Sequence, residues 1–196
     1  MRRRQFILTT GAALAVGGIG LAGCTTTPPK SASGSSENTD KRRTINAGVD
    51  TTLARLYSSA DGSRELVAKA RGVLVFPSVI QAGFWVGGQY GEGALRVGGQ
   101  TVGYYSTAGG SFGLQLGAQS KAIIFLFMTQ DALDRFRNSE GWAAGVDATV
   151  AAVKVGANGN IDTSTATAPV EAFVLTNAGL MAGVSLEGTK ITRLKI

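Results

Sequence analysis

The stretch that most limits how this chain can fold runs from Gly87 to Gly117 and reads GGQYGEGALRVGGQTVGYYSTAGGSFGLQLG. Between its glycines, apolar and polar residues tend to alternate, which is the period of a β-strand rather than of a helix. Glycine pairs at 98–99 and 109–110 interrupt the alternation, and such pairs are typical of tight turns between antiparallel strands. We therefore expect consecutive antiparallel strands joined by glycine turns.

Glycine clusters also occur in nucleotide-binding loops, but the context of this stretch argues against one. A dinucleotide or P-loop fingerprint places its glycines between a strand and a helix whose N-terminus receives the phosphate. Strands are predicted on both sides here, and neither G-x-G-x-x-G nor G-x-x-x-x-G-K-[ST] occurs in the stretch. Glycine within a strand marks a bulge, a barrel corner or a close backbone approach, so we expect a tightly curved sheet. The alternative is a phosphate-binding nest at Gly109-Gly110-Ser111.

Two helices are predicted ahead of these strands. Apolar residues recur at helical spacing from Val49 to Ala60, and Asp61-Gly62 ends the pattern. A second helix is expected to run from Ser63, as N-cap, to a stop at Gly72.

The remainder of the chain alternates between further strands and one short helix. Val73–Phe76 is a short apolar strand closed by Pro77, and Ala122–Met128 has the length and composition of a strand buried on both faces. Thr129 is expected to cap a helix that turns Leu133 and Phe136 inward. Further strands are predicted over 145–153, with Val146, Ala148 and Val150 on one face, and over 170–176 and 180–188. The predicted class is α+β: a large curved antiparallel sheet, barrel-like or a sandwich, with two N-terminal helices and one short helix between strands.

The N-terminus has the pattern of an export signal. Three arginines precede an apolar run that ends in small residues; the alternative is a membrane-spanning anchor over Phe6–Gly23, which glycine and threonine dilute. The segment Leu21–Cys24, LAGC, resembles the lipobox of bacterial lipoproteins, which implies cleavage before Cys24 and acylation of its sulfur. RRRQFIL also resembles a twin-arginine signal, so the export route stays open. Thr25 after the cysteine implies sorting to the outer membrane.

These features divide the chain into a signal peptide over 1–23, a flexible polar tether over 24–43 and a folded domain over 44–196. The tether reads TTTPPKSASGSSENTDKRR after Cys24, a composition that buries little surface. Lys41, Arg42 and Arg43 at its end either touch anionic headgroups or form a solvated linker end.

The charge balance excludes a nucleic-acid binder. The chain has 19 basic and 13 acidic residues, a formal charge of +6. Three of the basic residues leave with the signal peptide, and from Thr44 onward 12 basic residues face 11 acidic ones. The folded domain therefore lacks the basic footprint that nucleic-acid binding needs.

Catalytic chemistry has few candidates in this sequence. Histidine is absent and Cys24 is the one cysteine, which removes Ser-His-Asp, Cys-His and His-ligated zinc sites. Of the carboxylates, Asp131 and Asp134 are expected on a polar helix face, and Glu171 and Glu187 on the solvent side of their strands. We expect no enzyme, no cofactor and no metal.

Three motifs resemble the SYLF domain, also called the actin-binding-like or DUF500 domain. They are AKARGVLVFPSVIQAGFWVGGQYGEGAL (68–95), GGSFGLQLGAQSKAIIFLFM (109–128) and GLMAGVSLEGTKI (179–191), and the resemblance spans Val49 to Leu194. Eukaryotic members pair the domain with SH3 or FYVE modules, bind phosphoinositides and bundle actin near membranes, whereas bacterial members are often lipoproteins. In animal members an N-terminal amphipathic helix contributes to lipid binding. The resemblance therefore points to the basic residues of the corresponding region as headgroup ligands: Arg55, Arg64, Lys69 and Arg71.

The expected function is that of a bacterial lipoprotein, anchored through Cys24 to the cell envelope, at the outer membrane, whose SYLF domain binds anionic phospholipid or phosphoinositide-like headgroups without catalysis. A charged outer face on a helix that packs on the core explains the same basic residues without any ligand. The alternative function is a structural or host-interaction lipoprotein that binds another envelope or host protein. Because the export signal directs the chain to where actin is absent, no actin partner is expected.

Overall fold

A computed structural model of the protein describes residues 33–83, 86–112, 119–153, 161, 168–181 and 186–196. The predicted signal peptide, Cys24 and the residues up to 32 lie outside this part, as do Trp85, Gly113 and residues 182–185. No helix among the described residues is both long enough and apolar enough to span a membrane.

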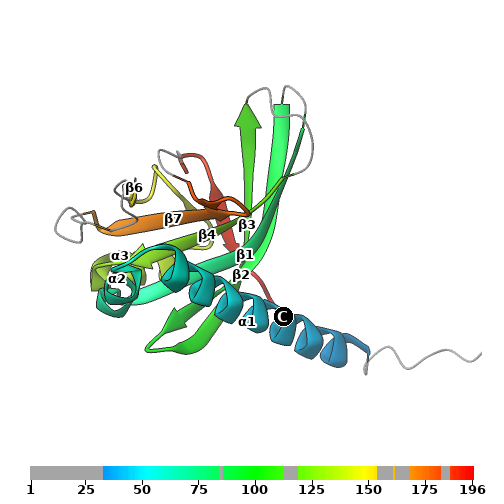
Figure 1. Ribbon diagram of the computed structural model, residues 1–196. Coiled ribbons are helices and arrows are strands. Elements are labelled where there is room, and N and C mark those ends of the chain that lie inside the picture. Colours follow the sequence, from blue (N-terminus) through cyan, green and yellow to red (C-terminus); the bar gives the residue numbers. More distant parts are fainter. Residues whose placement is uncertain (1–32, 84–85, 113–118, 154–160, 162–167, 182–185) are drawn as a thin grey trace, which may run out of the picture.

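One curled sheet organises the described part of the chain (Figure 1). The helices are α1 (Ser33–Ser59), α2 (Ser63–Lys69) and α3 (Gln130–Asn138). The strands are β1 (Gly72–Gly83), β2 (Val86–Val97), β3 (Gln100–Phe112), β4 (Gln119–Phe127), β5 (Trp142–Ala143), β6 (Val150–Ala152), β7 (Val170–Thr176), β8 (Gly179–Leu180) and β9 (Lys190–Arg193). Their order in the sheet is β5-β9-β3-β2-β1-β4-β7-β6, with β8 paired to β7. The α+β class and the curved sheet are confirmed; the β6–β7 pair is parallel, unlike the other pairs.

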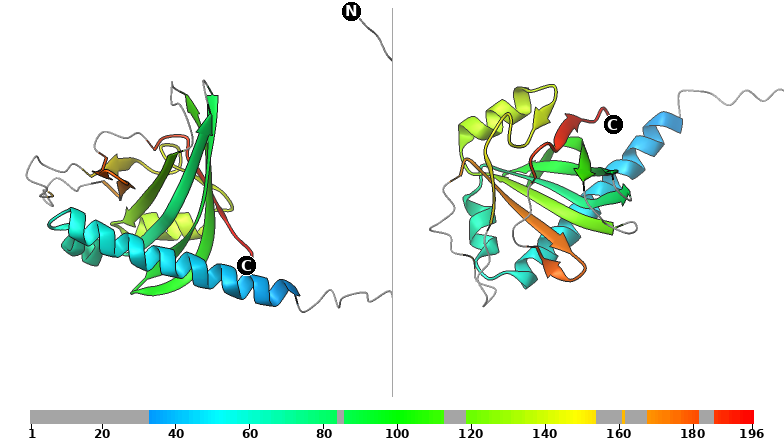
Figure 2. Two further views of the ribbon diagram at one scale, coloured as in Figure 1. Left: turned by 45° about the vertical axis from the view of Figure 1, so that its right-hand side comes forward. Right: turned by 90° about the horizontal axis from the view of Figure 1, so that it is seen from above.

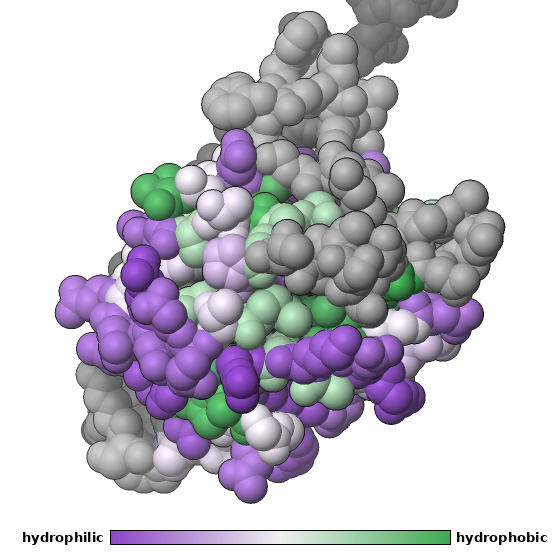
Figure 3. Space-filling view, turned by 90° about the vertical axis from the view of Figure 1, so that its left-hand side faces the viewer, coloured by the Kyte–Doolittle hydropathy of each residue, from purple (hydrophilic) through white to green (hydrophobic). Residues whose placement is uncertain are grey.

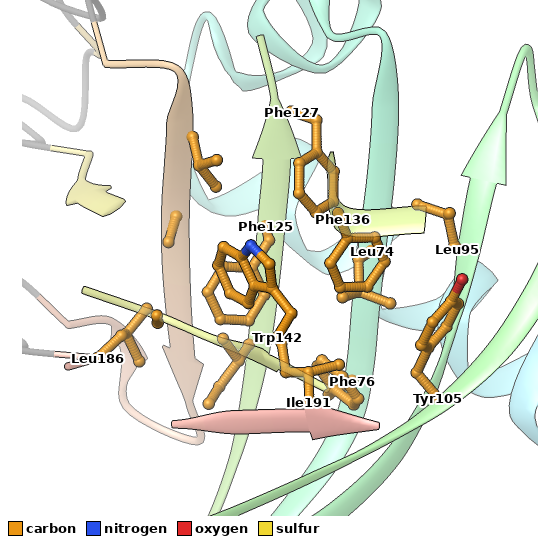
Figure 4. Close-up of a cluster of buried hydrophobic side chains, with 14 of the residues drawn as sticks. Leu74, Phe76, Leu95, Tyr105, Phe125, Phe127, Phe136, Trp142, Leu186 and Ile191 are labelled. Carbon is orange, nitrogen blue, oxygen red and sulfur yellow. The ribbon is translucent and has the colours of Figure 1, made fainter. Parts of the chain in front are cut away.

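The sheet separates two hydrophobic cores. On its outer face, α1 and α2 cover a core that includes Val49, Leu56, Ile124 and Phe173. On its inner face, toward which β5 and β9 curl, a second core gathers around Trp142 (Figures 2 and 4). There the Trp142 ring makes edge-to-face contacts with Phe125, Phe127 and Phe136, at centroid distances of 5.6–6.3 Å. These two faces are called outer and inner below.

Helix α1 begins 11 residues before the predicted domain boundary, so the prediction of a flexible tether is wrong for Ser33–Arg43. The helix is held by contacts with the rest of the fold: Lys41 Nζ lies 2.8 Å from a Glu92 carboxylate oxygen, and Arg42 donates to the Ile196 carbonyl. Figure 1 accordingly shows the C-terminus beside α1. Helix α1 also packs closely against β1 at Gly48, where a Cβ atom would lie 2.9 Å from Pro77 Cγ.

The second helix differs from its prediction at both ends. Gly62, with φ of 85°, is its N-cap, and Ser63 is instead its buried first residue, whose hydroxyl donates to the Leu56 carbonyl. The helix ends at Lys69, and Gly72 starts β1.

Residues 87–112 of the glycine-rich stretch form one long hairpin. Gly98 and Gly99 have φ of 58° and 82°, so the predicted turn is confirmed, and their positive φ is what a two-residue hairpin turn requires. Gly109 and Gly110, in contrast, lie inside β3, opposite Gln89 and Gly88. The predicted break at 109–110 is therefore wrong. The extended backbone there is also not the alternating conformation of a phosphate-binding nest.

A bulge and two crowded glycines curve the sheet. Strand β1 does not end at Pro77 as predicted but continues to Gly83, with a shift in register between Val75 and Ser78. Proline lacks a backbone N–H and is accommodated at such irregularities. A Cβ atom at Gly93 would lie 2.1 Å from the Val75 carbonyl oxygen. A Cβ atom at Gly91 would lie 2.7 Å from the Ser78 carbonyl oxygen. The prediction that glycines allow close approach in a curved sheet is borne out at these two positions.

The next strand and helix match their predictions. Residues 122–127 of β4 are all buried, and the Thr129 side chain accepts a hydrogen bond from the Ala132 N–H at the start of α3. Leu133 and Phe136 are buried against the inner core.

The chain after α3 departs from its prediction. Residues 145–147 form a turn, in which Gly145 has a φ of 82°. Val146 is therefore 80% exposed and does not face a core. The Asp147 carboxylate accepts a hydrogen bond from the Ala143 N–H and closes this turn. Glu171, predicted to face solvent, is only 2% exposed, whereas Glu187 is exposed as predicted.

Candidate functional site

An open groove lies where α1, α2 and the end of β2 meet. Helix α1 supplies one wall, because residues three, four and seven positions apart share one side of a helix. Strand β2 supplies Arg96, and α2 supplies Arg64. The groove is lined by Asp50, Leu53, Ala54, Tyr57, Ser58, Arg64 and Arg96.

The Arg64 guanidinium lies over the aromatic ring of Tyr57. Its central carbon is 4.2 Å from the ring centroid, within the range of a cation–π contact. Stacking of this kind holds the guanidinium plane while leaving the N–H groups at its edge open to a ligand. Arg64 is exposed, and no acidic side chain of the described residues forms an ion pair with it. Arg64 is therefore a positioned cation without an ion-pair partner among the described residues.

Arg96 forms the second cation of the groove. Its Nη1 lies 2.6 Å from a carboxylate oxygen of Asp50, while its buried Nε has no hydrogen-bond partner within the described part of the chain. The Arg96 side chain is 18% exposed and that of Asp50 66% exposed. Two guanidinium groups thus face one carboxylate, and the groove has an excess of one positive charge.

The four predicted headgroup ligands do not form one cluster. Arg55 lies two residues from Tyr57 on α1, roughly 200° around the helix, and donates to the Thr176 carbonyl at 3.0 Å on the other flank. Lys69 is paired with Glu65, with 2.8 Å between Nζ and a carboxylate oxygen. This pairing lowers the pKa of the Glu65 carboxyl through a hydrogen bond and the charge of Lys69. Arg71 is exposed just beyond α2. Of the four, Arg64 alone lines the groove.

Two groove residues, Tyr57 and Arg96, were not among the sequence candidates. Tyr57 lies seven residues after Asp50, two helical turns along the same side, which is a signal that the sequence carries. Arg96 comes from a strand nearly forty residues later, and only the packing of α1 across β2 brings it to the helix.

The basic residues at the end of the predicted tether have partners within the protein. Arg42 lies 5.9 Å from the Tyr104 ring centroid, and Arg43 pairs with Asp40 at 3.2 Å. Burial raises the pKa of Glu92, but hydrogen bonds donated by Lys41 and Tyr90 outweigh it and hold the pKa below its ordinary value. Lys41 and Arg42 therefore stabilise the α1–sheet contact.

The carboxylates considered for catalysis have structural partners. Asp131 pairs with Arg135 at 3.1 Å, and Asp134 accepts a hydrogen bond from Gln130 at 2.9 Å. Glu171 accepts a hydrogen bond from the Ala168 N–H, and burial raises the pKa of its carboxyl despite that bond. Across the described ranges, no three His, Cys, Asp or Glu side chains gather as metal ligands would.

The surface beyond the groove is mixed in character. Figure 3 views the end of the molecule at which α2 and α3 lie, and hydrophilic side chains there surround smaller hydrophobic areas. In α3 the two acidic residues, Asp131 and Asp134, precede the two basic ones, Arg135 and Arg137.

Part of the chain matches a known protein family. Residues 108–195 match the family described as "Ysc84: Las17-binding protein actin regulator". This segment runs from the second half of β3 to the last residues after β9 and does not include the groove. No curated protein matches the chain.

Proposed function

We propose that this protein, whose residues 108–195 match the Ysc84 family and whose motifs resemble the SYLF domain, is a non-catalytic, lipid-anchored envelope protein that binds anionic phospholipid headgroups in the groove between α1, α2 and β2. The observation that carries this proposal is Arg64, stacked on Tyr57 with its donors open, beside a second arginine. A guanidinium edge matches the geometry of a phosphate, to which it donates paired hydrogen bonds.

Acylation of Cys24 would supply the stable attachment to the membrane. Two or more acyl chains are needed for lasting anchoring, because each buried methylene contributes about 0.8 kcal/mol and one chain is marginal. Eight residues lie between Cys24 and the start of α1, against nineteen for the tether predicted from the sequence. The nine Cα–Cα steps across them span at most about 30 Å. The anchor would therefore hold α1 near the bilayer surface.

Headgroup binding at the groove is expected to be weak on its own. One basic residue near an anionic surface contributes about 1 kcal/mol, and salt reduces that. A tether of this length raises the local concentration of headgroups at the domain, so weak binding suffices to orient it. The acyl chains would fix the location, and the groove would select the headgroup and the orientation.

Vesicle flotation of the protein lacking residues 1–24 tests the groove separately from the anchor. Vesicles of phosphatidylglycerol, cardiolipin, phosphatidic acid or neutral lipid are compared at low salt. We expect Arg64→Gln to lower binding to anionic vesicles about fivefold, the equivalent of roughly 1 kcal/mol. The matched control is Arg55→Gln, which removes the same charge from the opposite flank of α1 and should lower binding less.

Some results of the flotation experiment would contradict headgroup binding in the groove. If Arg64→Gln and Arg55→Gln lose the same amount of vesicle binding, the net charge of the protein determines binding and the groove does not. Wild-type binding by Arg64→Gln, or equal binding to neutral and anionic vesicles, would remove lipid headgroups as the ligand of this site.

A second candidate function is binding of another envelope or host protein. The matched family is described as binding a protein, and one surface of this chain suits such a contact. Ile80 and Tyr90 lie directly opposite each other on β1 and β2 and are 56% and 52% exposed. Chemical cross-linking in intact cells, with Ile80→Ser as the test variant, distinguishes this role: a cross-linked protein lost in that variant but kept in Arg64→Gln supports it.

A further inference from the structure

The inner face of the curled sheet changes from apolar to polar along its strands. Val79 of β1 is fully buried in the inner core, and its cross-strand partners are Gly91 of β2 and Lys121 of β4. Residues directly opposite each other in a sheet point to the same face, so Lys121 faces inward at the border of the core. One step further along the strands, Gln81 and Gln89 are paired on the same face.

Lys121 is a half-buried cation with little compensation. Within the described part of the chain its Nζ has one hydrogen-bond contact, to the neutral amide oxygen of Gln81, at 3.4 Å. That distance is longer than the usual 2.7–3.2 Å or so for such bonds. No carboxylate of the described residues lies within ion-pair distance of Lys121. Burial lowers the pKa of its ammonium, which is the effect of desolvation without an anion nearby.

The neighbouring polar groups on this face are also incompletely bonded. Gln89 Nε2 lies 3.4 Å from the Thr189 hydroxyl, and it reaches across Gly109, where a Cβ atom would come within 2.9 Å of that nitrogen. Thr107, opposite Gly91, is fully buried, and its hydroxyl has no partner within the described ranges. A buried hydroxyl without a partner costs free energy and is uncommon in native structures.

We propose that this face forms a second binding site, in which Lys121, Gln81 and Gln89 bind a small oxyanion, a carboxylate or a phosphate group. The site is separate from the groove, since it lies on the opposite face of the sheet and Lys121 belongs to β4.

The chemistry of the donors selects this class of ligand. Lysine supplies a point charge with three N–H donors, and the glutamine amides supply neutral N–H donors. The described groups include no fixed negative charge, so the site would repel neither a carboxylate nor a phosphate. An oxyanion would neutralise the half-buried ammonium and shorten its poor hydrogen bonds to charge-assisted ones.

The glycines of the stretch have a role in this site. Side chains at 91 and 109 would stand between the polar groups on neighbouring strands. Val79 Cγ2 and Gln89 Nε2 occupy these places, 2.8 Å and 2.9 Å from where the Cβ atoms at 91 and 109 would lie. The two glycines therefore let Val79 and Gln89 lie across the neighbouring strands.

Nuclear magnetic resonance on the full-length chain tests the proposal. Sodium phosphate and sodium acetate are titrated at constant ionic strength, with sodium chloride as the control for general screening. We expect saturable shifts of the Gln81 and Gln89 side-chain amide signals and of the Lys121 backbone signal. Lys121→Met should weaken binding about tenfold or more, because it removes a charge-assisted hydrogen bond. Lys121→Arg should retain it, and Lys195→Met, an exposed lysine near the C-terminus, should leave it unchanged.

A further arm identifies the source of the anion. Vesicles containing phosphatidic acid are compared with free phosphate at the same phosphate concentration. Shifts with both, or with free phosphate only, support a site for soluble oxyanions; shifts with vesicles only support a headgroup as the source. Arg64→Gln should titrate as wild type in every arm, so failure of the headgroup groove leaves this test intact. Absence of saturable shifts, or a Lys121→Met variant that titrates like wild type, would overturn the proposal.

Discussion

Replacement of Gly93 by alanine should destabilise the domain strongly, because this position lets β1 and β2 approach at the bend of the sheet. The added Cβ would lie 2.1 Å from the Val75 carbonyl oxygen and 2.7 Å from Phe76 Cδ1. Non-bonded heavy atoms prefer about 3.5 Å, so the strands would have to separate by roughly 1 Å. Overpacking of this kind costs about 1–3 kcal/mol, and occasionally more where backbone must move. We expect about 3 kcal/mol, which is a large part of the roughly 5–15 kcal/mol that stabilises a typical domain.

Gly88→Ala is the matched control in the same strand. A Cβ atom there has no neighbour within 4 Å, so we expect a change of less than about 1 kcal/mol, in the stabilising direction if any. Urea unfolding followed by circular dichroism measures both variants; a change in midpoint at constant slope reports stability directly. In thermal unfolding, 3 kcal/mol corresponds to a fall in Tm of roughly 6–12 °C. If Gly93→Ala unfolds at the wild-type midpoint, close approach is not what this glycine provides, and the account of the curvature is wrong.

Two further substitutions test the anchor and a buried carboxyl. Cys24→Ser should release the protein from membrane fractions, measured by sedimentation and immunoblotting, and full retention would remove the lipid anchor. Glu171→Gln should raise Tm at pH 7 while keeping an acceptor for the Ala168 N–H. Burial raises the pKa of Glu171 above its ordinary 4.5, so the folded state binds the proton more tightly than the unfolded state. The stability gained from that proton is fully present below pH 4.5 and is lost as the pH rises through the raised pKa. The advantage of the glutamine variant should therefore shrink in acid, and a constant difference in Tm across this range would contradict the assignment.

Elements with strong local signals were predictable from the sequence. Ala122–Met128 is apolar throughout and became a buried strand, and Thr129 followed by an amphipathic segment became a capped helix. Gly98-Gly99 became the hairpin turn because two consecutive positive φ angles are costly for other residues. In each of these cases the residues that form the signal also form the structure.

Other elements depend on partners far away in the chain. Val146 lies in an alternating segment, yet the Asp147 carboxylate bonds the Ala143 N–H and a turn results. Glu171 has the sequence pattern of a solvent-facing strand residue, but its side lies on the outer face, where helices cover the sheet. A Cβ atom at Gly103 would lie 3.0 Å from Tyr105 Cε2, and Gly113 is outside the described residues. The severe contacts are at Gly91 and Gly93, which only the register of β1 against β2 defines.

The same dependence on distant partners explains why the basic residues could be listed but not assembled from the sequence. The segment from Ser33 to Arg43 is polar and has no apolar stripe, so local signals favour a tether. Its helix is held instead by Glu92 and the C-terminal residue, which lie 51 and 154 positions away. Once α1 is extended and placed across β2, Asp50 meets Arg96, and Tyr57 on the same side of the helix meets Arg64. Arg55 is directed to the opposite flank by the same placement. The orientation of one helix therefore decides which of four equivalent arginines and lysines belongs to the groove, and it also shortens the link between the groove and the proposed lipid anchor.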